Sequence, residues 1–266
     1  MALRQARAGN RSPMTLDGTR TFVVGSRRPL VIDPGPADEE HLRAVAKLLA
    51  GAVPTAILLT HAHADHSGNA EALAMLAGAP IGMGRGARRL PFPETSVGRW
   101  LADGDEVECD AGVIRVVKTP GHTPEHLAFY WETGEGAGTL FAGDLFLGVG
   151  DTTLVSAPEG NLQDYLQSLE VIGELDPTVI YPAHGPALRR PEAAVNRYVR
   201  HRLRRIEQVK EAQAINPGVT AQELVEPMYG ADLDPRLRSA ALGSIAAVFE
   251  YLEAGGAEGP VRDRIC

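Results

Sequence analysis

Short apolar runs alternate with helical patterns along the chain up to residue 185. Most of the runs are four or five residues long, are rich in β-branched residues and end in turn or polar residues, so they predict strands. The predicted strands cover residues 21–24, 30–32, 56–59, 113–117, 127–131, 139–142 and 179–181. Apolar residues at a helical period predict helices over residues 37–50, 68–77 and 162–175. Strands that alternate with helices are typical of a layered α/β fold.

One long segment without periodicity interrupts this alternation at residues 82–98. The segment contains four Gly and two Pro, which are residues that break regular elements. We interpret the whole segment as a single loop. Long loops in compact domains are often lids over a functional site.

From Pro191 onward the pattern is helical. Pro191 suits the first turn of a long helix, and Pro217 ends that helix. The predicted C-terminal helices cover residues 192–214, a short stretch from Ala221, and residues 235–254. We therefore expect a larger α/β domain over residues 1–190 and a small helical domain over residues 191–266.

Composition and charge exclude several classes of protein. The formal charge of −8 is too acidic for a protein that coats nucleic acid. No run approaches the roughly 18 consecutive apolar residues of a membrane-spanning helix, so we expect no membrane partner. Cys109 and Cys266 are far apart and lack CxxC spacing, which argues against a disulfide scaffold and a thiolate zinc finger. No apolar signal sequence follows the basic N-terminus, and we expect a cytoplasmic protein.

The most informative motif follows the predicted strand at residues 56–59. His61, His63, Asp65 and His66 lie within six residues, where the chain turns into a helix. Side chains two residues apart on an extended segment point the same way, so His61 and His63 can share one metal ion. Asp65 and His66 can reach a second ion about 3.5 to 4 Å away. Imidazole and carboxylate groups suit zinc, and also iron or manganese.

Three further candidates, His122, Asp144 and His184, each follow an apolar run. Taken singly, each is better explained as a structural residue, in a capped turn or as a hydrogen-bonded histidine. Functional residues of α/β proteins gather at strand ends, however. Together with the first motif these residues therefore predict a ligand set for two metals.

The order His61-x-His63-x-Asp65-His66, then His122, Asp144 and His184, resembles the metallo-β-lactamase-fold hydrolase superfamily over roughly residues 15–190. The resemblance implies an αββα sandwich with the site at one sheet edge. It also implies that His61, His63 and His122 hold one metal ion, that Asp65, His66 and His184 hold the other, and that Asp144 bridges the two. Within the superfamily the chain is similar to a group of endoribonuclease-like and acyl-hydrolase proteins. This likeness is carried by residues 13–19 and 120–123 and, near the C-terminus, by His201-Arg202, Leu224-Val225 and Tyr229. It implies a C-terminal winged-helix-like domain.

Several other residues have two interpretations each. Asp33 resembles a family acid that accepts a hydrogen bond from a ligand histidine, and it also suits an ordinary turn before Pro. His126 can touch substrate or serve as a structural histidine, the latter being favoured. Residues 145–147 can line an apolar pocket or belong to the core. The loop arginines can bind an anionic group of the substrate or be solvated; they are Arg85, Arg88 and Arg89. The basic residues of the long helix can contact phosphates or pair with nearby acids; they are Arg197, Arg200, His201, Arg202, Arg204 and Arg205.

These observations favour a dinuclear metal-dependent hydrolase in which two cations, zinc in the first instance, generate a bridging hydroxide at neutral pH. Asp65 is the candidate orienter of that hydroxide or carrier of its proton. The acidic first domain and the scarcity of aromatic residues, 5% of the chain, favour a small ester or thioester substrate. One alternative is cleavage of single-stranded RNA, and another is a non-catalytic DNA-binding regulator.

Overall fold

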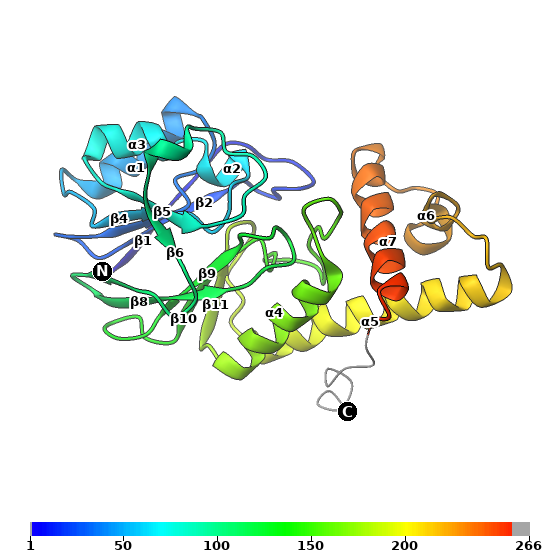
Figure 1. Ribbon diagram of the computed structural model, residues 1–266. Helices are drawn as coiled ribbons and strands as arrows, with labels where there is room; N and C mark the ends of the chain where they lie inside the picture. Colours follow the sequence, from blue (N-terminus) through cyan, green and yellow to red (C-terminus); the bar gives the residue numbers. More distant parts are fainter. Residues whose placement is uncertain (1, 257–266) are drawn as a thin grey trace.

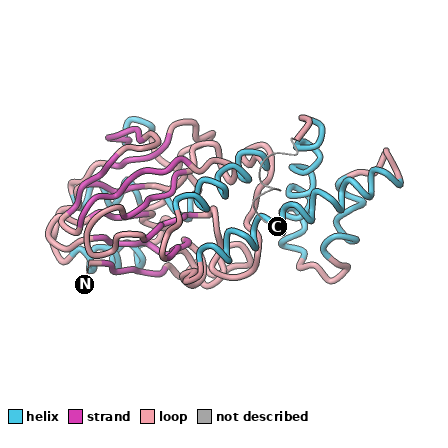
Figure 2. Tube along the Cα trace, turned by 90° about the horizontal axis from the view of Figure 1, so that it is seen from below, coloured by secondary structure: helices cyan, strands magenta, loops and turns pink. Residues whose placement is uncertain are grey.

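The computed structural model describes residues 2–256, which form two β-sheets packed face to face with helices outside them (Figure 1; Figure 2). The first sheet runs in the order β1 (Leu3–Arg7), β2 (Arg20–Val24), β3 (Leu30–Ile32), β4 (Ala56–Leu58), β5 (Ile81–Gly84) and β6 (Val97–Leu101). The second runs in the order β11 (Val179–Pro182), β10 (Thr139–Gly143), β9 (Leu127–Trp131), β8 (Gly112–Lys118) and β7 (Glu106–Cys109). Strands β3 to β6 are parallel to one another, and so are β10 and β11.

The helices divide into two sets. Those that follow strands of the first sheet are α1 (Glu39–Leu49), the single turn α2 (Ala64–Ser67) and α3 (Ala70–Ala77). The others are α4 (Leu162–Leu175), α5 (Pro191–Ile215), α6 (Ala221–Tyr229) and α7 (Arg238–Glu253). Two short 3-10 turns, η1 (Glu94–Ser96) and η2 (Pro235–Leu237), complete the described elements.

Alternating side chains on the strands build the layers. On β2, Val23 packs toward α1 and α3, whereas Phe22 and Val24 pack against the second sheet. The outer face of the second sheet buries Leu140 and Ile180 against α4 and α5. Such period-2 alternation places every second side chain on the opposite face. The predicted α/β sandwich is thus present as four layers, helix, sheet, sheet and helix.

The predicted strands and helices of the first 190 residues are all present, and their ends differ from the prediction by two residues at most. Four strands were not predicted: β1, β5, β6 and β7. The predicted loop at 82–98 is wrong at both ends, since 82–84 belong to β5 and 97–98 to β6. Strand β5 was missed because its glycines are typical of loops. Gly84 is needed there because a Cβ would lie 2.3 Å from the carbonyl oxygen of Glu125.

The C-terminal helices are confirmed, and α5 begins at Pro191 as expected. Tyr165 of α4, Tyr198 of α5 and Val248 of α7 share one core cluster, so α7 packs against α4 and α5, which cover the second sheet. The described residues after Pro182 contain no strand. The winged-helix likeness and the boundary at 190/191 therefore stay predictions. Cys109 lies on β7, and Cys266 lies outside the described residues.

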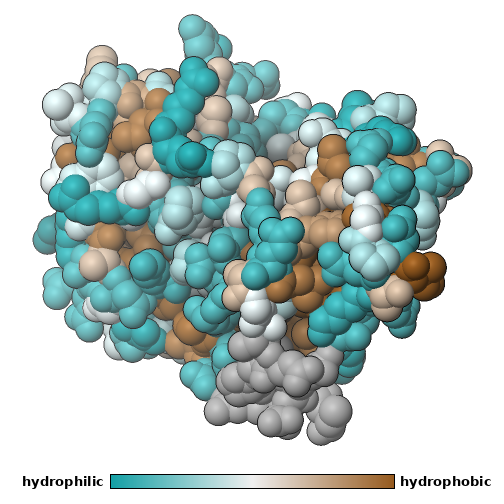
Figure 3. Space-filling view, turned by 45° about the vertical axis from the view of Figure 1, so that its right-hand side comes forward, coloured by the Kyte–Doolittle hydropathy of each residue, from teal (hydrophilic) through white to brown (hydrophobic). Residues whose placement is uncertain are grey.

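Membrane insertion is not indicated by any helix of the described chain, because none is long and apolar enough to cross a bilayer. Apolar residues nevertheless reach the surface, and in Figure 3 they gather in the half of the view that holds the C-terminal helices.

Candidate metal centre

The seven predicted ligand residues all lie together where strands of both sheets end. Thr60 and His61 continue from β4, and His63 caps the single turn α2, which carries Asp65 and His66. His122 lies in the loop between β8 and β9, Asp144 follows β10 directly, and His184 follows β11. Each side chain is therefore presented by a loop or a helical turn that follows a buried strand.

The first group of side chains consists of His61, His63 and His122. Nδ1 of His63 lies 2.9 Å from Nε2 of His61 and 3.1 Å from Nε2 of His122. His61 is fully buried and His122 is 6% exposed. Three imidazole nitrogens thus converge on one point, and these residues form one of the side-chain groups able to hold a metal ion.

The second group consists of Asp65, His66 and His184. Nε2 of His184 lies 3.2 Å from Oδ2 of Asp65, and Nε2 of His66 lies 3.5 Å from the same oxygen. Asp144 stands between the two groups. Its Oδ1 is 3.4 Å from His66 and 3.2 Å from His184, and its Oδ2 is 3.7 Å from His122. One carboxylate therefore faces both groups.

Hydrogen bonds select the tautomers of the first group. His122 Nδ1 donates to the carbonyl oxygen of Leu154 at 2.7 Å. His63 Nε2 donates to Oε2 of Glu159 at 2.9 Å. The hydroxyl of Thr60 donates to Asp33, so it accepts from Nδ1 of His61 at 3.0 Å. A neutral imidazole has one donor nitrogen and one acceptor nitrogen, so the three nitrogens that converge all carry lone pairs.

Asp33 fixes His66 in the same way. Its Oδ2 accepts from Nδ1 of His66 at 2.9 Å and from the hydroxyl of Thr60 at 2.8 Å, while its Oδ1 accepts from the backbone amide of Thr60 at 2.8 Å. The Nε2 lone pair of His66 is thereby directed toward Asp65 and Asp144. The predicted role of Asp33 as acceptor for a histidine of the site matches this geometry.

Metal ions fit this donor set. Nε2 of His66, Nε2 of His184 and Oδ1 of Asp144 are buried and make no hydrogen bond. Buried polar atoms without partners are rare and costly, and the converging lone pairs of the first group repel one another. A cation between these atoms removes both costs, and nitrogen and oxygen donors of this kind suit zinc and related transition metals.

The electrostatics of the centre point the same way. Burial opposes charge on His184, but the carboxylates of Asp144 and Asp65 outweigh it and raise the pKa of His184 to about 9. The pKa of His66 is raised for the same reason, against burial, by Asp65, Asp144 and Asp33. Burial likewise opposes ionisation of Asp65, yet the neighbouring histidines hold the pKa of its carboxyl at about 2. The carboxylates of the centre therefore favour positive charge between them, either as protons on His66 and His184 or as bound cations.

His126 has the structural role that was favoured for it. Its ring is fully buried, Nδ1 contacts Oγ1 of Thr119 at 2.9 Å, and Nε2 accepts from the backbone amide of Asp144 at 3.3 Å. Burial is the main reason why the pKa of His126 falls to about 3, and the ring stays neutral. His126 thus supports the backbone at Asp144 and does not reach the surface of the site.

Two glutamates near the centre were not predicted. Glu159 pairs with His63 although 96 residues separate them, and Oε1 of Glu125 accepts from the backbone amide of Ala62 at 3.0 Å. Glu125 is 4% exposed, so it holds the segment between His61 and His63 from inside the protein. Neither contact has a sequence signal, because each depends on how two loops pack.

A cavity of about 400 Å³ opens over the centre. The side chains of the metal centre that line it are His63, Asp65, His122, Asp144 and His184. The rest of the lining is mostly apolar and consists of Pro13, Met14, Thr15, Leu147, Thr152, Thr153, Leu154, Tyr229, Leu233, Leu237, Ala240, Ala241 and Ser244. Of residues 145–147, Leu147 lines the cavity while Leu145 and Phe146 are core. No Lys or Arg is among the described residues that line the cavity.

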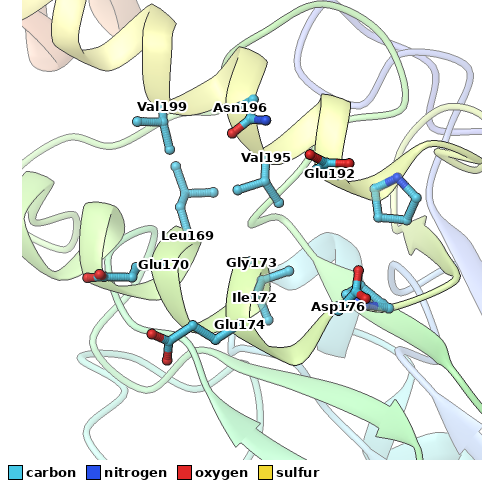
Figure 4. Close-up of a pocket in the computed structure, with 12 residues that line it drawn as sticks. Leu169, Glu170, Ile172, Gly173, Glu174, Asp176, Glu192, Val195, Asn196 and Val199 are labelled. Atoms are coloured by element: carbon cyan, nitrogen blue, oxygen red, sulfur yellow. The ribbon is translucent and has the colours of Figure 1, made fainter. Parts of the chain in front are cut away.

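A second cavity, of about 270 Å³, lies between α4 and α5. Figure 4 shows Leu169, Ile172, Val195 and Val199 in it, with carboxylates such as Glu192 around them. It contains none of the seven predicted ligand residues. We therefore place the chemistry at the first cavity.

The basic face of α5 is turned toward the loop after Asp144. Nε of Arg197 donates to the carbonyl oxygen of Gly150, and Arg202 donates to that of Thr153. His201 and Arg204 both contact the carboxylate of Asp151, at 3.1 and 3.5 Å. This loop also carries Leu154, the acceptor for His122. The basic helix therefore holds a loop of the site, in agreement with the alternative that its charges are paired.

His201 makes the folding stability of the protein depend on pH. Its Nδ1 faces Asp151, and its Nε2 is buried without a partner. Burial lowers the pKa of His201 to about 4, with the neighbouring Arg202 acting in the same direction. As pH falls from about 6.5 to about 4, the unfolded chain takes up a proton at this histidine and the folded protein does not. Folding stability must therefore decrease over this window, by up to about 3 kcal/mol for one group.

We predict that His201→Gln loses less stability than the wild type between pH 7 and pH 4.5. The measurement is urea denaturation of both metal-free proteins, which removes the effect of metal loss in acid. The difference in the free energy of unfolding between the two proteins should narrow as pH falls. Parallel losses in the two proteins would show that His201 is not responsible.

The comparison with known families decides the assignment. The description of the metallo-beta-lactamase superfamily matches residues 15–184, which contain every residue of the centre. The chain belongs to this superfamily. Its members are metal-dependent hydrolases, and the chain is accordingly a hydrolase of the metallo-beta-lactamase superfamily.

Relatives extend the likeness across the C-terminal helices. Beta-lactamase-like protein 2 homolog of Caenorhabditis elegans is 31% identical over 251 residues, 91% of this chain and 81% of the relative. Atrochrysone carboxyl ACP thioesterase of Aspergillus fumigatus is 30% identical over 237 residues, 84% of this chain and 71% of the relative. The crystal structure of a beta-lactamase domain protein from Burkholderia ambifaria has a TM-score of 0.79 and 25% identity, covering 96% of this chain and 86% of that one.

Proposed function

We propose that this superfamily member hydrolyses a small ester or thioester with an apolar acyl group, using two divalent metal ions. His61, His63 and His122 would hold one ion, Asp65, His66 and His184 the other, and Asp144 would contact both. Zinc is the metal that this mixture of imidazole and carboxylate donors favours, with iron and manganese as the alternatives. The substrate would meet the protein in the cytoplasm.

The observation that carries this proposal is the lining of the cavity over the centre. Apolar side chains such as Met14, Leu147 and Leu233 surround the five residues of the centre that line the cavity, and no described cation lines the space. Burial of an acyl chain against these side chains provides binding free energy of about 25 cal/mol for each Å² of apolar surface. A phosphodiester would bring negative charge to a cavity without a counter-charge from the protein.

The residues of the centre have distinct roles in this reaction. Two metal ions in such a site lower the pKa of water and polarise a carbonyl oxygen. Asp65 lines the cavity and is ionised at neutral pH, so its carboxylate can accept a proton from the attacking water and pass it to the leaving group. Asp33 and Glu159 keep His66 and His63 in the tautomers that leave their other nitrogens free to bind metal.

The named relatives support an acyl substrate, since one of them is called a thioesterase. Single-stranded RNA is the weaker candidate. Its backbone would require cationic contacts, whereas Arg197, Arg202 and Arg204 of the basic helix are engaged with the protein's own loop. DNA binding by a non-catalytic protein is weaker still, because the complete centre has no role in it.

The loop arginines should be dispensable for substrate binding. Arg85 stacks over Trp100, with 4.6 Å between its guanidinium and the ring centre, and Arg88 donates to the carbonyl oxygen of Pro158. These two and Arg89 are exposed, and none of the three lines the cavity. We predict that replacing all three with Ala changes KM for the preferred ester or thioester by less than about twofold. A large rise in KM in steady-state assays would place these arginines at the substrate.

The experiment that tests the proposal compares substrate classes directly. Zinc-loaded wild type and Asp144→Ala are assayed in parallel against acyl thioesters, acyl esters and a fluorescent single-stranded RNA. We expect the wild type to cleave an ester or thioester, and Asp144→Ala to cleave none of the substrates. Cleavage of RNA by the wild type, with no ester or thioester cleaved, would overturn the proposal. Cleavage by both proteins would reveal a contaminating hydrolase. That contaminant would be removed by further purification, and the assays would be repeated.

A further inference from the structure

Part of the wall of the cavity over the metal centre comes from α7. Ala240, Ala241 and Ser244 line the cavity, and we refer to them as the α7 wall. Residues three and four apart on a helix lie on the same face, so these positions present one surface to the cavity. The neighbouring positions Ile245 and Val248 are buried in the core of the C-terminal helices. The α7 wall therefore belongs to a helix that is anchored in the core by the neighbouring residues Ile245 and Val248.

A glycine fixes the distance of this wall from the centre. Gly243 lies against the loop that carries Leu154, and a Cβ at position 243 would lie 2.0 Å from Oγ of Ser156. The helix can approach that loop closely only because residue 243 has no side chain. The same loop carries Leu154, whose carbonyl oxygen accepts the hydrogen bond from His122. One loop therefore contacts both α7 and the metal centre. Figure 1 shows α7 beside the loops at that end of the sheets.

The side chains of the wall are small. Ala240, Ala241 and Ser244 have side chains of one or two heavy atoms, while Leu233 and Leu237, which also line the cavity, are large. Small residues in the wall of a cavity that also contains a reactive centre leave space that an extended group can fill. Larger residues at the same positions would shorten the cavity without touching a residue of the centre.

We propose that Ala240 and Ser244 of the α7 wall set the length of the acyl group that the hydrolase accepts. The proposal rests on the ester or thioester hydrolysis proposed above and assigns its specificity to the C-terminal helices. The acyl chain extends from the centre toward α7, and its end contacts these two residues. A longer side chain at either position excludes long acyl groups and leaves short ones unaffected.

The test measures acyl-length profiles of the zinc-loaded full chain and of two variants, Ala240→Leu and Ser244→Leu. Ser239→Leu is the matched control, because it adds a similar volume at an exposed position of the same helix. Substrates are thioesters of one small thiol with saturated acyl groups of increasing length. We expect the wall variants to lower kcat/KM for the longest acyl group that the wild type cleaves by about 10- to 100-fold and to leave the acetyl thioester within about twofold. The control should follow the wild type.

Profiles that match the wild type in both wall variants would overturn the inference while leaving the proposed function intact. If the wild type cleaves neither a thioester nor the corresponding ester, the proposed function fails, and the wall is tested by binding. Calorimetry then measures the Kd of saturated fatty acids of increasing length for the same proteins. At least tenfold weaker binding of the longest fatty acid by the wall variants alone supports the inference. Equal affinities in all the proteins would overturn it, and melting temperatures show whether each variant is folded.

Discussion

Replacing Asp144 by Ala should remove bound metal and lower kcat/KM by at least about 10³-fold. Asp144 faces both groups of the centre, with Oδ1 3.2 Å from His184 and Oδ2 3.7 Å from His122. Its loss removes the one negative charge shared by the two groups, and a thousandfold change corresponds to only about 4 kcal/mol. Metal analysis of the dialysed protein and steady-state kinetics measure the two effects.

The control for this prediction is Glu108→Ala, which removes an exposed carboxylate from the edge strand β7. It should bind metal and turn over substrate as the wild type does. A variant at Asp144 that keeps both its metal content and its activity would show that the ligand assignment is wrong. Loss of activity with full metal content would show that Asp144 acts in the chemical step and is not needed to bind metal.

Replacing Asp33 by Ala should weaken metal binding by about 10- to 100-fold, although Asp33 lies outside the ligand set. The variant leaves three donors without their acceptor: the amide and hydroxyl of Thr60 and Nδ1 of His66. His66 then loses the hydrogen bond that selects its tautomer. Each unpaired buried donor also costs about 1 to 3 kcal/mol of folding stability. Competition with a chromogenic chelator gives the metal affinity, and denaturation of the metal-free protein gives the stability.

Asp33→Asn provides the graded comparison, because its amide oxygen can still accept while its NH2 group faces donors. We expect its metal affinity to fall between those of the wild type and Asp33→Ala. If Asp33→Ala binds metal with unchanged affinity, the carboxylate of Asp33 contributes nothing to the centre. A loss of stability without a loss of metal affinity would have the same meaning.

The sequence predicts much of the fold because buried strands have a strong pattern. Thr21, Phe22 and Val23 alternate between the two faces of β2, and the run is bounded by polar residues. Edge strands carry weaker signals. β1 reads Leu-Arg-Gln-Ala-Arg, and its place in the sheet comes from backbone pairing with β2 rather than from burial. Gly84 of β5 is required by close packing, and the glycines of this strand look like loop residues in the sequence.

The candidate centre could be located from the sequence because its residues follow strands. His61, Asp144 and His184 each stand after an apolar run, and the topology of the two sheets brings those strand ends together. Glu159 could not be found in this way, since its contact with His63 depends on the course of a long loop. The cavity wall was also beyond prediction, because the packing of α7 against that loop depends on Gly243.

The central claim is that hydrolysis of an ester or thioester depends on two metal ions at the seven clustered side chains. The most direct measurement adds zinc in steps to the metal-free protein and follows bound metal and the rate of ester or thioester hydrolysis together. We predict that activity is absent without metal and reaches its maximum at two bound equivalents per chain. Full activity in the metal-free protein, or maximal activity at one bound equivalent per chain, would contradict the claim.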